Sequence, residues 1–186
     1  DSLRNNFNMS LDDIVILFVG SLELDKLNDL INVNKKLMDK SFNVKFVVVG
    51  KGSKSINFEK LVKENNLSSK FKFTGFLSEV DLIRYMNLAD IAYSDYWSLV
   101  GFPRKIFEYM AASLPVIVKN SKPIREVLED GRESMLYNNS DEFNSKLKEL
   151  ISNPKLRKKL GSNSRSLSKH YTWALSSNVL LGAIDT

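Results

Sequence analysis

Two almost uninterrupted runs of β-branched and aromatic residues constrain the fold of this chain more than any other feature. They are Ile14–Gly20, which reads IVILFVG, and Val44–Gly50, which reads VKFVVVG. Runs of this kind are typical of strands buried on both faces, which occur in parallel sheets covered by helices. Between them, over residues 24–39, apolar residues recur at helical spacing. We therefore expect a strand–helix–strand unit with a right-handed crossover.

The alternation of strand-like and helix-like segments then continues along the chain. We expect further helices at 56–67, 78–90, 103–113 and 123–131, and further strands at 70–76, 90–96, 114–120 and 134–137. Ser78 is a suitable N-cap for the helix that it begins, because its hydroxyl can accept a backbone N–H of the first turn. Gly131 is a suitable stop for the last of these helices.

The rest of the chain, residues 141–186, has a helical pattern throughout. We expect three helices there, with breaks near Asn153 and near His170. The whole chain, residues 1–186, is then a single doubly wound, Rossmann-like α/β domain of about six parallel strands with a helical C-terminal tail. Because the sequence begins with Asp1 rather than Met, we expect it to be one part of a longer protein.

Four glycine-containing turns follow the first four predicted strands, and ligands of such sheets bind at these strand ends. They read GSLELDK, GKGSKS, TGFLSE and SDYWSLVGFPRK. Lys26, at the end of the first turn, lies near a helix start, where an ammonium and free amides suit a phosphate. The second turn lacks the spacing of a P-loop or a dinucleotide fingerprint, so Gly50 and Gly52 alone favour a tight turn over a binding site.

The fourth turn carries the most specific combination of residues. The backbone amides of Phe102, Arg104 and Lys105, with two cationic side chains, suit a diphosphate, whereas Pro103 has no N–H to offer. Glu108, one turn further into the helix, can accept hydrogen bonds from a ribose diol. The alternative is an amphipathic helix whose Glu108 is merely solvated. The small side chains at 111 and 112 lead us to expect tight packing of this helix on the sheet.

Charge and composition exclude several classes of site. The sequence has no Cys and one His, so disulfides, thiolate zinc sites, cysteine nucleophiles and multi-histidine metal sites are excluded. It has no apolar run near the ~20 residues that span a bilayer. The 27 Lys and Arg against 22 Asp and Glu give a net charge of +5, but the basic residues are scattered. We therefore set nucleic acid aside in favour of a phosphate-bearing small molecule or an anionic membrane surface.

The segment FEYMAASLPVIV resembles the EAMAxGxPVI signature of nucleotide-sugar glycosyltransferases of the GT-B fold, especially glycosyltransferase family 4 (group 1). Further segments are similar to that family in the same order, from about Ile14 to Trp173. Among them are ILFVGSLELDKLNDLI, VKFVVVGKG and KFKFTGFLSEVDLIRYMNLADI. The resemblance implies the second, C-terminal half of a GT-B fold. That half binds a nucleoside-diphosphate sugar, without a required metal, while an N-terminal domain absent from this chain binds the acceptor.

The resemblance also assigns roles to the matching positions of this sequence. It implies that Lys26 neutralises the donor diphosphate, that Glu108 holds the ribose hydroxyls, and that the turn at Phe76 and Leu77 meets the nucleobase. Together with the charges of the fourth turn, this predicts diphosphate binding by Gly20, Ser21, Lys26, Phe102, Pro103, Arg104 and Lys105. The residues expected near the nucleobase are Gly50, Gly52, Phe76 and Leu77.

Departures from the family pattern affect the phosphate and sugar positions. The family's arginine after the first glycine is Ser21 here, and we hypothesise that Arg104 or Lys105 replaces its charge. The family's sugar-contacting glutamate, eight residues before Glu108, falls on Val100. The nearest acidic residue to that position is Asp95.

The leading hypothesis is the donor-binding domain of a retaining hexosyltransferase, inactive by itself. Its partners would be the nucleotide-sugar donor and the N-terminal acceptor domain, at a cytoplasmic location that includes the inner membrane surface. Val100 and Ser21 favour an alternative, a non-catalytic nucleotide-binding or partner module or one chain of a split transferase. A nucleotide-sugar epimerase is a third reading, against which the tail segments and the EYMA helix argue.

Overall fold

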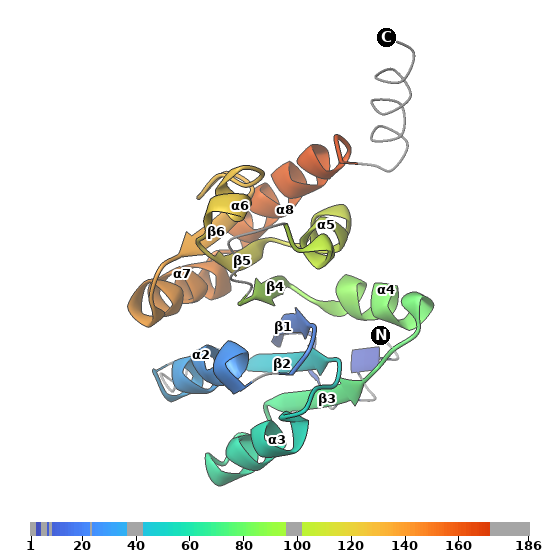
Figure 1. Cartoon of the computed structure of the whole chain (residues 1–186), viewed down its shortest axis with the longest axis vertical. Coiled ribbons are helices and arrows are strands. Elements are labelled where there is room, and N and C mark those ends of the chain that lie inside the picture. Colours follow the sequence, from blue (N-terminus) through green and yellow to red (C-terminus); the bar gives the residue numbers. More distant parts are fainter. Residues whose placement is uncertain are drawn as a thin grey trace.

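The computed structural model describes residues 3–4, 7, 9–22, 24–36, 43–95 and 102–171, with only the backbone of residues 24–26 and 34–36. Labels follow Figure 1. The strands are β1 (Ile14–Val19), β2 (Val44–Val49), β3 (Phe71–Gly75), β4 (Ile91–Ser94), β5 (Val116–Lys119) and β6 (Ser134–Tyr137). All strand pairs are parallel, and the order across the sheet is β3-β2-β1-β4-β5-β6. The predicted doubly wound sheet is confirmed.

Seven helices are described. They are α2 (Leu24–Lys36), α3 (Ser55–Glu64), α4 (Glu79–Leu88), α5 (Arg104–Ala111), α6 (Lys122–Arg125), α7 (Ser140–Ser152) and α8 (Pro154–Ser168). The Ser78 hydroxyl accepts the N–H of Asp81 and so caps α4 as predicted. Asn153 separates α7 from α8 as predicted, and its side chain accepts the N–H of Leu156. The third predicted tail helix lies outside the described residues.

Two expected helices differ from the structure at their ends. Pro103 precedes α5 in an extended conformation (φ −73°, ψ 114°) rather than forming its first turn. The expected helix at 123–131 is only the four-residue α6. It ends early because the chain turns there toward β6, where the Asp130 carboxylate accepts the N–H of Leu136 at 2.8 Å. Gly131 still reverses the chain, with φ +76°, within this loop.

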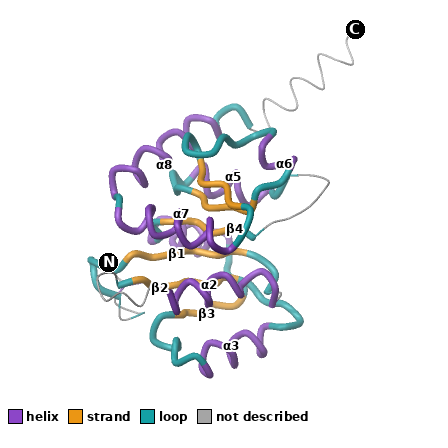
Figure 2. The backbone as a smooth tube through the Cα atoms, turned by 90° about the vertical axis from the view of Figure 1, so that its left-hand side faces the viewer, coloured by secondary structure: helices purple, strands orange, loops and turns teal. Residues whose placement is uncertain are grey.

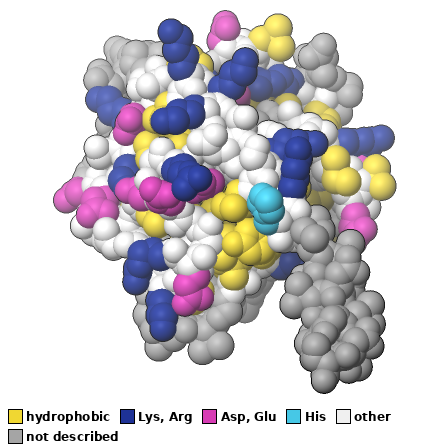
Figure 3. Space-filling view, turned by 90° about the horizontal axis from the view of Figure 1, so that it is seen from above, with side chains coloured by type: hydrophobic (Ala, Val, Ile, Leu, Met, Phe, Trp, Pro, Cys, Tyr) yellow, Lys and Arg dark blue, Asp and Glu magenta, His cyan; other side chains and the backbone are white. Residues whose placement is uncertain are grey.

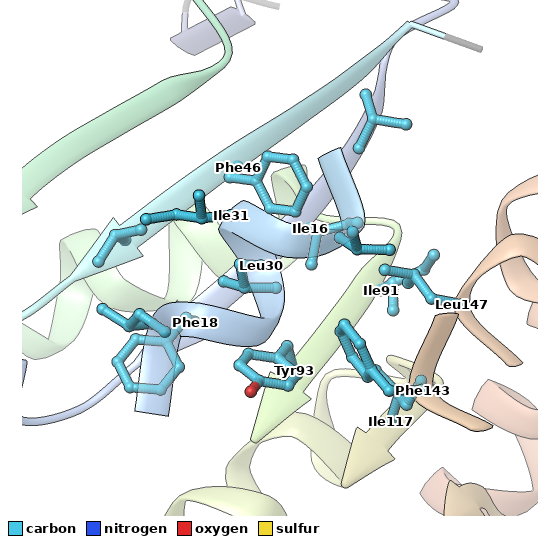
Figure 4. Close-up of a cluster of buried hydrophobic side chains, with 14 of the residues drawn as sticks. Ile16, Phe18, Leu30, Ile31, Phe46, Ile91, Tyr93, Ile117, Phe143 and Leu147 are labelled. Carbon is cyan, nitrogen blue, oxygen red and sulfur yellow. The ribbon is translucent and has the colours of Figure 1, made fainter. Parts of the chain in front are cut away.

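Helices cover both faces of the sheet, which explains the continuous apolar strands. In β1, Ile16 and Phe18 belong to a core beneath α2, α3 and α7 (Figure 4), whereas Val15 and Leu17 belong to a core beneath α4, α5 and α6. Figure 2 shows α2 and α7 in front of the strands. The four middle side chains of β1 are buried, and each contributes about 1.5–3 kcal/mol to folding. A strand of alternating apolar and polar residues would bury only half of them.

The strand order creates a topological switch point between β1 and β4. After β1 the chain moves outward to β2 and β3, then returns to place β4 on the opposite side of β1 (Figure 1). The helices that follow these two strands, α2 and α5, lie on opposite faces of the sheet. Such a switch point at the carboxyl ends of parallel strands is where this class of fold binds its ligands.

Candidate functional site

The turns that follow β1, β2 and β3 are stacked against one another at the carboxyl edge of the sheet. The Gly20 N–H donates to the Val49 carbonyl at 3.0 Å, and the Gly50 N–H donates to the Gly75 carbonyl at 2.8 Å. A Cβ at Gly50 would overlap the carbonyl oxygen of Gly20, and a Cβ at Gly52 would lie 2.7 Å from the backbone nitrogen of Leu22. Glycines at 50 and 52 are therefore needed to hold the turn after β1 in place.

Two side chains of α5 hold the last residue of β1. The Val19 N–H donates to the Tyr109 hydroxyl oxygen at 2.8 Å, and the Lys105 ammonium donates to the Val19 carbonyl at 2.7 Å. Residues 105 and 109 are one helical turn apart and so share a face of the helix. Burial raises the pKa of Tyr109, so its hydroxyl stays neutral. We call this contact of Lys105 and Tyr109 with Val19 the α5 clamp.

The α5 clamp places a positive charge at the switch point. The Lys105 Nζ lies 4.8 Å from the centroid of the Phe18 ring and beside Gly20. Arg104, in contrast, is 79% exposed, and its Nε is 3.7 Å from the Glu108 carboxylate. Of the two cations considered as a replacement at position 21, Lys105 is the one that the structure brings to β1, and the Ser21 side chain there is exposed.

Glu108 lines a surface groove of about 480 Å³ between α4 and α5. Glu79 and Leu82 line the same groove from the first turns of α4, directly after Phe76 and Leu77. The structure thus places the expected ribose and nucleobase positions on one side of the molecule. The other residues along the groove are Ile83, Met86, Asn87, Ala111, Ala112 and Arg165.

The expected packing of residues 111 and 112 is wrong for Ala111, which is exposed, whereas Ala112 is half-buried and packs against the core beneath α4, α5 and α6. The close approach occurs instead at Gly161 of α8, where a Cβ would collide with the carbonyl oxygen of Ser113. Sequence reasoning missed Gly161. The signal was a glycine inside an otherwise regular helix, which often marks close packing.

The side chains of two other predicted site residues lie outside the described part of the structure. Val100, the sugar-facing position, lies in the segment 96–101, outside the described residues. Lys26 lies in the first turn of α2, but its side chain is also outside the described part. His170, which no expected role involves, is exposed after the end of α8.

Sequence reasoning did not predict the contacts among polar side chains at the ends of β4, β5 and β6. The Asp95 Oδ1 lies 3.8 Å from the Lys119 ammonium and accepts a hydrogen bond from the Tyr137 hydroxyl at 3.3 Å. Asp95 had been named as the nearest acidic candidate for the sugar contact expected at position 100, at the wrong spacing along the chain, but its contacts with Lys119 and Tyr137 were not predicted. A polar residue directly after each buried strand was the available signal.

The charged groups of the described residues suggest neither a metal site nor a single-sign surface. Within those residues, no group of three or more His, Cys, Asp or Glu side chains could hold a metal ion. None of the described helices is long and apolar enough to cross a membrane. On the face seen in Figure 3, Lys and Arg side chains are interspersed with Asp and Glu.

Comparison with known proteins identifies the family to which this chain belongs. The family described as "Glycosyl transferases group 1" matches residues 1–167. The chain is similar to the glycosyltransferase EpsD of Bacillus subtilis, with 26% identity over 92% of this chain and 45% of EpsD. It is similar to the glycosyltransferase MJ1178 of Methanocaldococcus jannaschii, with 33% identity over 84% of this chain and 44% of that protein.

A solved structure agrees with this assignment at the level of the fold. The structure of Anabaena Alr3699/HepE in complex with UDP matches with a TM-score of 0.84 and 17% identity, over 100% of this chain and 52% of that one. The fold is therefore that of the C-terminal domains of GT-B glycosyltransferases. The chain spans less than half the length of EpsD and MJ1178. From the matched residues, the chain belongs to the group 1 glycosyltransferase family.

Proposed function

We propose that this chain is the donor-binding domain of a retaining glycosyltransferase that transfers a sugar from a nucleoside-diphosphate sugar to an acceptor. The observation that carries the proposal is the α5 clamp, which holds the Lys105 ammonium beside Gly20 at the switch point. The UDP named in the HepE structure supports a nucleotide as the ligand. The acceptor would be bound by an N-terminal domain outside this sequence, so the chain alone would bind the donor and transfer little.

In this proposal the residues at the switch point between β1 and β4 stabilise the leaving group. A departing nucleoside diphosphate gains negative charge in the transition state, so fixed positive groups around it lower the barrier. The Lys105 ammonium and the amides at the start of α5 supply such groups, with Lys26 as the expected second cation. These cations take the part that a metal ion plays in other transferases, so we propose transfer without a metal.

Glu108 completes the nucleotide site in this proposal. Its carboxylate is partly exposed in the groove between α4 and α5, where it can accept both hydroxyls of a ribose. The base would then lie toward the start of α4, and the diphosphate toward β1. We place the reaction in the cytoplasm, where nucleotide sugars are made, with the acceptor presented there or at the inner membrane surface.

A thermal-shift panel tests the proposal. We expect UDP, GDP, ADP or TDP to raise the melting temperature of the chain, and Glu108→Ala to abolish that rise. Glu149→Ala, which removes an exposed carboxylate from α7, is the matched control and should leave the rise unchanged. Absence of any rise with all four nucleotides would contradict the proposal.

An assay of sugar transfer distinguishes the transferase from the non-catalytic alternative. Val100 stands where the family has its sugar-contacting glutamate, which is the observation that favours that alternative. The acceptor domain is supplied with the native chain and with Val100→Glu. Turnover by the native chain supports the transferase, whereas turnover only after Val100→Glu supports a nucleotide-binding partner module.

A further inference from the structure

The helix α4 and the turn that leads into it expose three large apolar side chains. Val80 is 63% exposed and Ile83 is 58% exposed on the helix, and Phe76 is 76% exposed in the turn. Single exposed apolar residues are common, whereas several close together mark a contact surface. We call Phe76, Val80 and Ile83 the α4 patch. The other exposed large apolar side chains of the described residues come one each from three other parts of the chain, at Leu11, Ile56 and Tyr171.

The α4 patch is not needed to attach α4 to the sheet. Tyr85 and Met86 are buried in the core beneath α4, α5 and α6, and Leu82 packs against that core. These residues already give α4 the one apolar side that a surface helix usually has. Val80 and Ile83, three residues apart, form a second apolar side. That second side has no role in the fold and is available to a partner.

The α4 patch begins at the carboxyl edge of the sheet, where the donor site is proposed. Phe76 directly follows β3. From Glu79, the first residue of α4, to Ile83 the helix rises only about 6 Å. A domain that lies across the carboxyl edge therefore reaches Val80 and Ile83 when it extends over the first turns of α4.

The first described residues of the chain also lie against α4. The ring centroid of Phe7 is 5.6 Å from that of Tyr85, and the Arg4 guanidinium donates to the carbonyl of Leu88 at 3.4 Å. A domain that precedes this sequence would therefore join it beside α4. The proposed function includes such a domain, and the chain spans less than half the length of EpsD and MJ1178.

The charged residues around the α4 patch suit a protein partner better than a membrane. Asp81 and Arg84 form an exposed ion pair at 3.1 Å, and Glu79 is exposed in the same helix. The helix thus carries two acidic residues and one basic residue, whereas anionic membranes bind clusters of Lys and Arg. An apolar centre with a polar rim is typical of a protein–protein interface.

We propose that the α4 patch is the docking surface for the acceptor domain. This inference rests on the proposed function, which requires a second domain across the carboxyl edge. Apolar side chains of that domain would cover Val80 and Ile83, since the burial of apolar surface drives association. The contact would hold the two domains in one orientation over the donor site, beside the groove that Glu108 lines.

Hydroxyl-radical footprinting without nucleotide tests the inference, on this chain alone and on the complete protein with its acceptor domain. Because a fully buried side chain is about 95% shielded from solvent, the oxidation rates of Val80 and Ile83 should fall about tenfold in the complete protein. Ile56 on α3 is 81% exposed on the opposite face of the sheet and serves as the internal control. Its oxidation rate should be the same in both proteins.

A charge placed in the proposed contact tests the same surface independently. Because Val80 is exposed in this chain, Val80→Asp should leave the urea midpoint of the chain and its Kd for UDP or GDP unchanged. In the complete protein, Val80→Asp should return the oxidation rate of Ile83 to the value found in this chain alone. Ile56→Asp is the matched control and should leave Ile83 protected.

The outcomes separate this inference from the proposed function. Equal oxidation of Val80 and Ile83 in the two proteins would overturn the inference, as would protection that survives Val80→Asp. Protection that appears in this chain as its own concentration rises would assign the α4 patch to a second copy, and protection only by vesicles containing phosphatidylglycerol would assign it to a membrane. Each of these results contradicts docking of the acceptor domain, while nucleotide binding by the chain leaves the proposed function standing. If the chain binds neither UDP nor GDP, the proposed function fails and this inference fails with it.

Discussion

Replacing Lys105 with methionine removes the positive charge from the end of β1 while keeping a side chain of similar length. The lost contacts are the 2.7 Å hydrogen bond to the Val19 carbonyl and the interaction with the Phe18 ring at 4.8 Å. Each of these contributes about 0.5–1 kcal/mol to folding, so the variant should lose about 1–2 kcal/mol of unfolding free energy. A domain of this size tolerates that loss and stays folded.

The loss in nucleotide affinity should be larger than the loss in stability suggests. A hydrogen bond between an ammonium and a phosphate oxygen is worth about 1.5–3 kcal/mol. That range corresponds to a weakening of roughly 10- to 150-fold in the Kd of UDP. Because the interaction is electrostatic, added salt should weaken nucleotide binding by native protein more than by Lys105→Met.

Titration calorimetry at fixed ionic strength measures this effect on folded protein. Arg104→Met is the control, since Arg104 is 79% exposed and pairs with Glu108 along the helix, and it should change the Kd by less than about threefold. Ser21→Arg, added to Lys105→Met, should restore affinity by returning a cation to the same strand end. Native affinity in Lys105→Met, or a loss confined to Arg104→Met, would refute the assignment of the diphosphate to the α5 clamp.

Two further outcomes follow from the tyrosines. Tyr109→Phe leaves the Val19 N–H without its acceptor and should lower the unfolding free energy in urea by about 1–3 kcal/mol, whereas Tyr85→Phe on α4 should cost less than about 0.5 kcal/mol. Burial raises the pKa values of Tyr93, Tyr109 and Tyr137 above 10.0, so folding favours their protonated forms. This stability is fully present below pH 10 and should fall as the pH rises above it, by about 1.4 kcal/mol per pH unit for each tyrosine. Urea unfolding between pH 9 and 11 measures the slope, which Tyr137→Phe should make shallower; a flat profile would contradict the role of burial.

The strands and most helices could be predicted because they depend on local periodicity. A strand such as Ile14–Val19 is apolar on both faces, and only a sheet covered on both sides can bury it. The capping residue Ser78 was equally readable, since its hydroxyl acts within its own turn. The short α6 could not be read in this way, because the Asp130 contact with β6 that competes with the helix depends on the finished sheet.

The turns that form the candidate site could be predicted from the sequence, but the positions of their side chains relative to β1 could not. Sequence alone left Arg104 and Lys105 equivalent, since both stand at the same helix entrance. What separates them is the direction in which each side chain leaves α5, and that depends on how the helix packs on β1. The contact between Lys105 and Val19 joins residues 86 positions apart, so no local pattern contains it. Tyr109 is fully buried, and its hydrogen bond to Val19 was not predicted.

In the proposed function, the α5 clamp makes one helix responsible for both folding and ligand binding. The hydrogen bond between Tyr109 and Val19 fixes the position of α5 relative to β1. The position of the Lys105 ammonium, one turn earlier on the same helix, therefore depends on that contact. A substitution within α5 should therefore change stability and nucleotide affinity together.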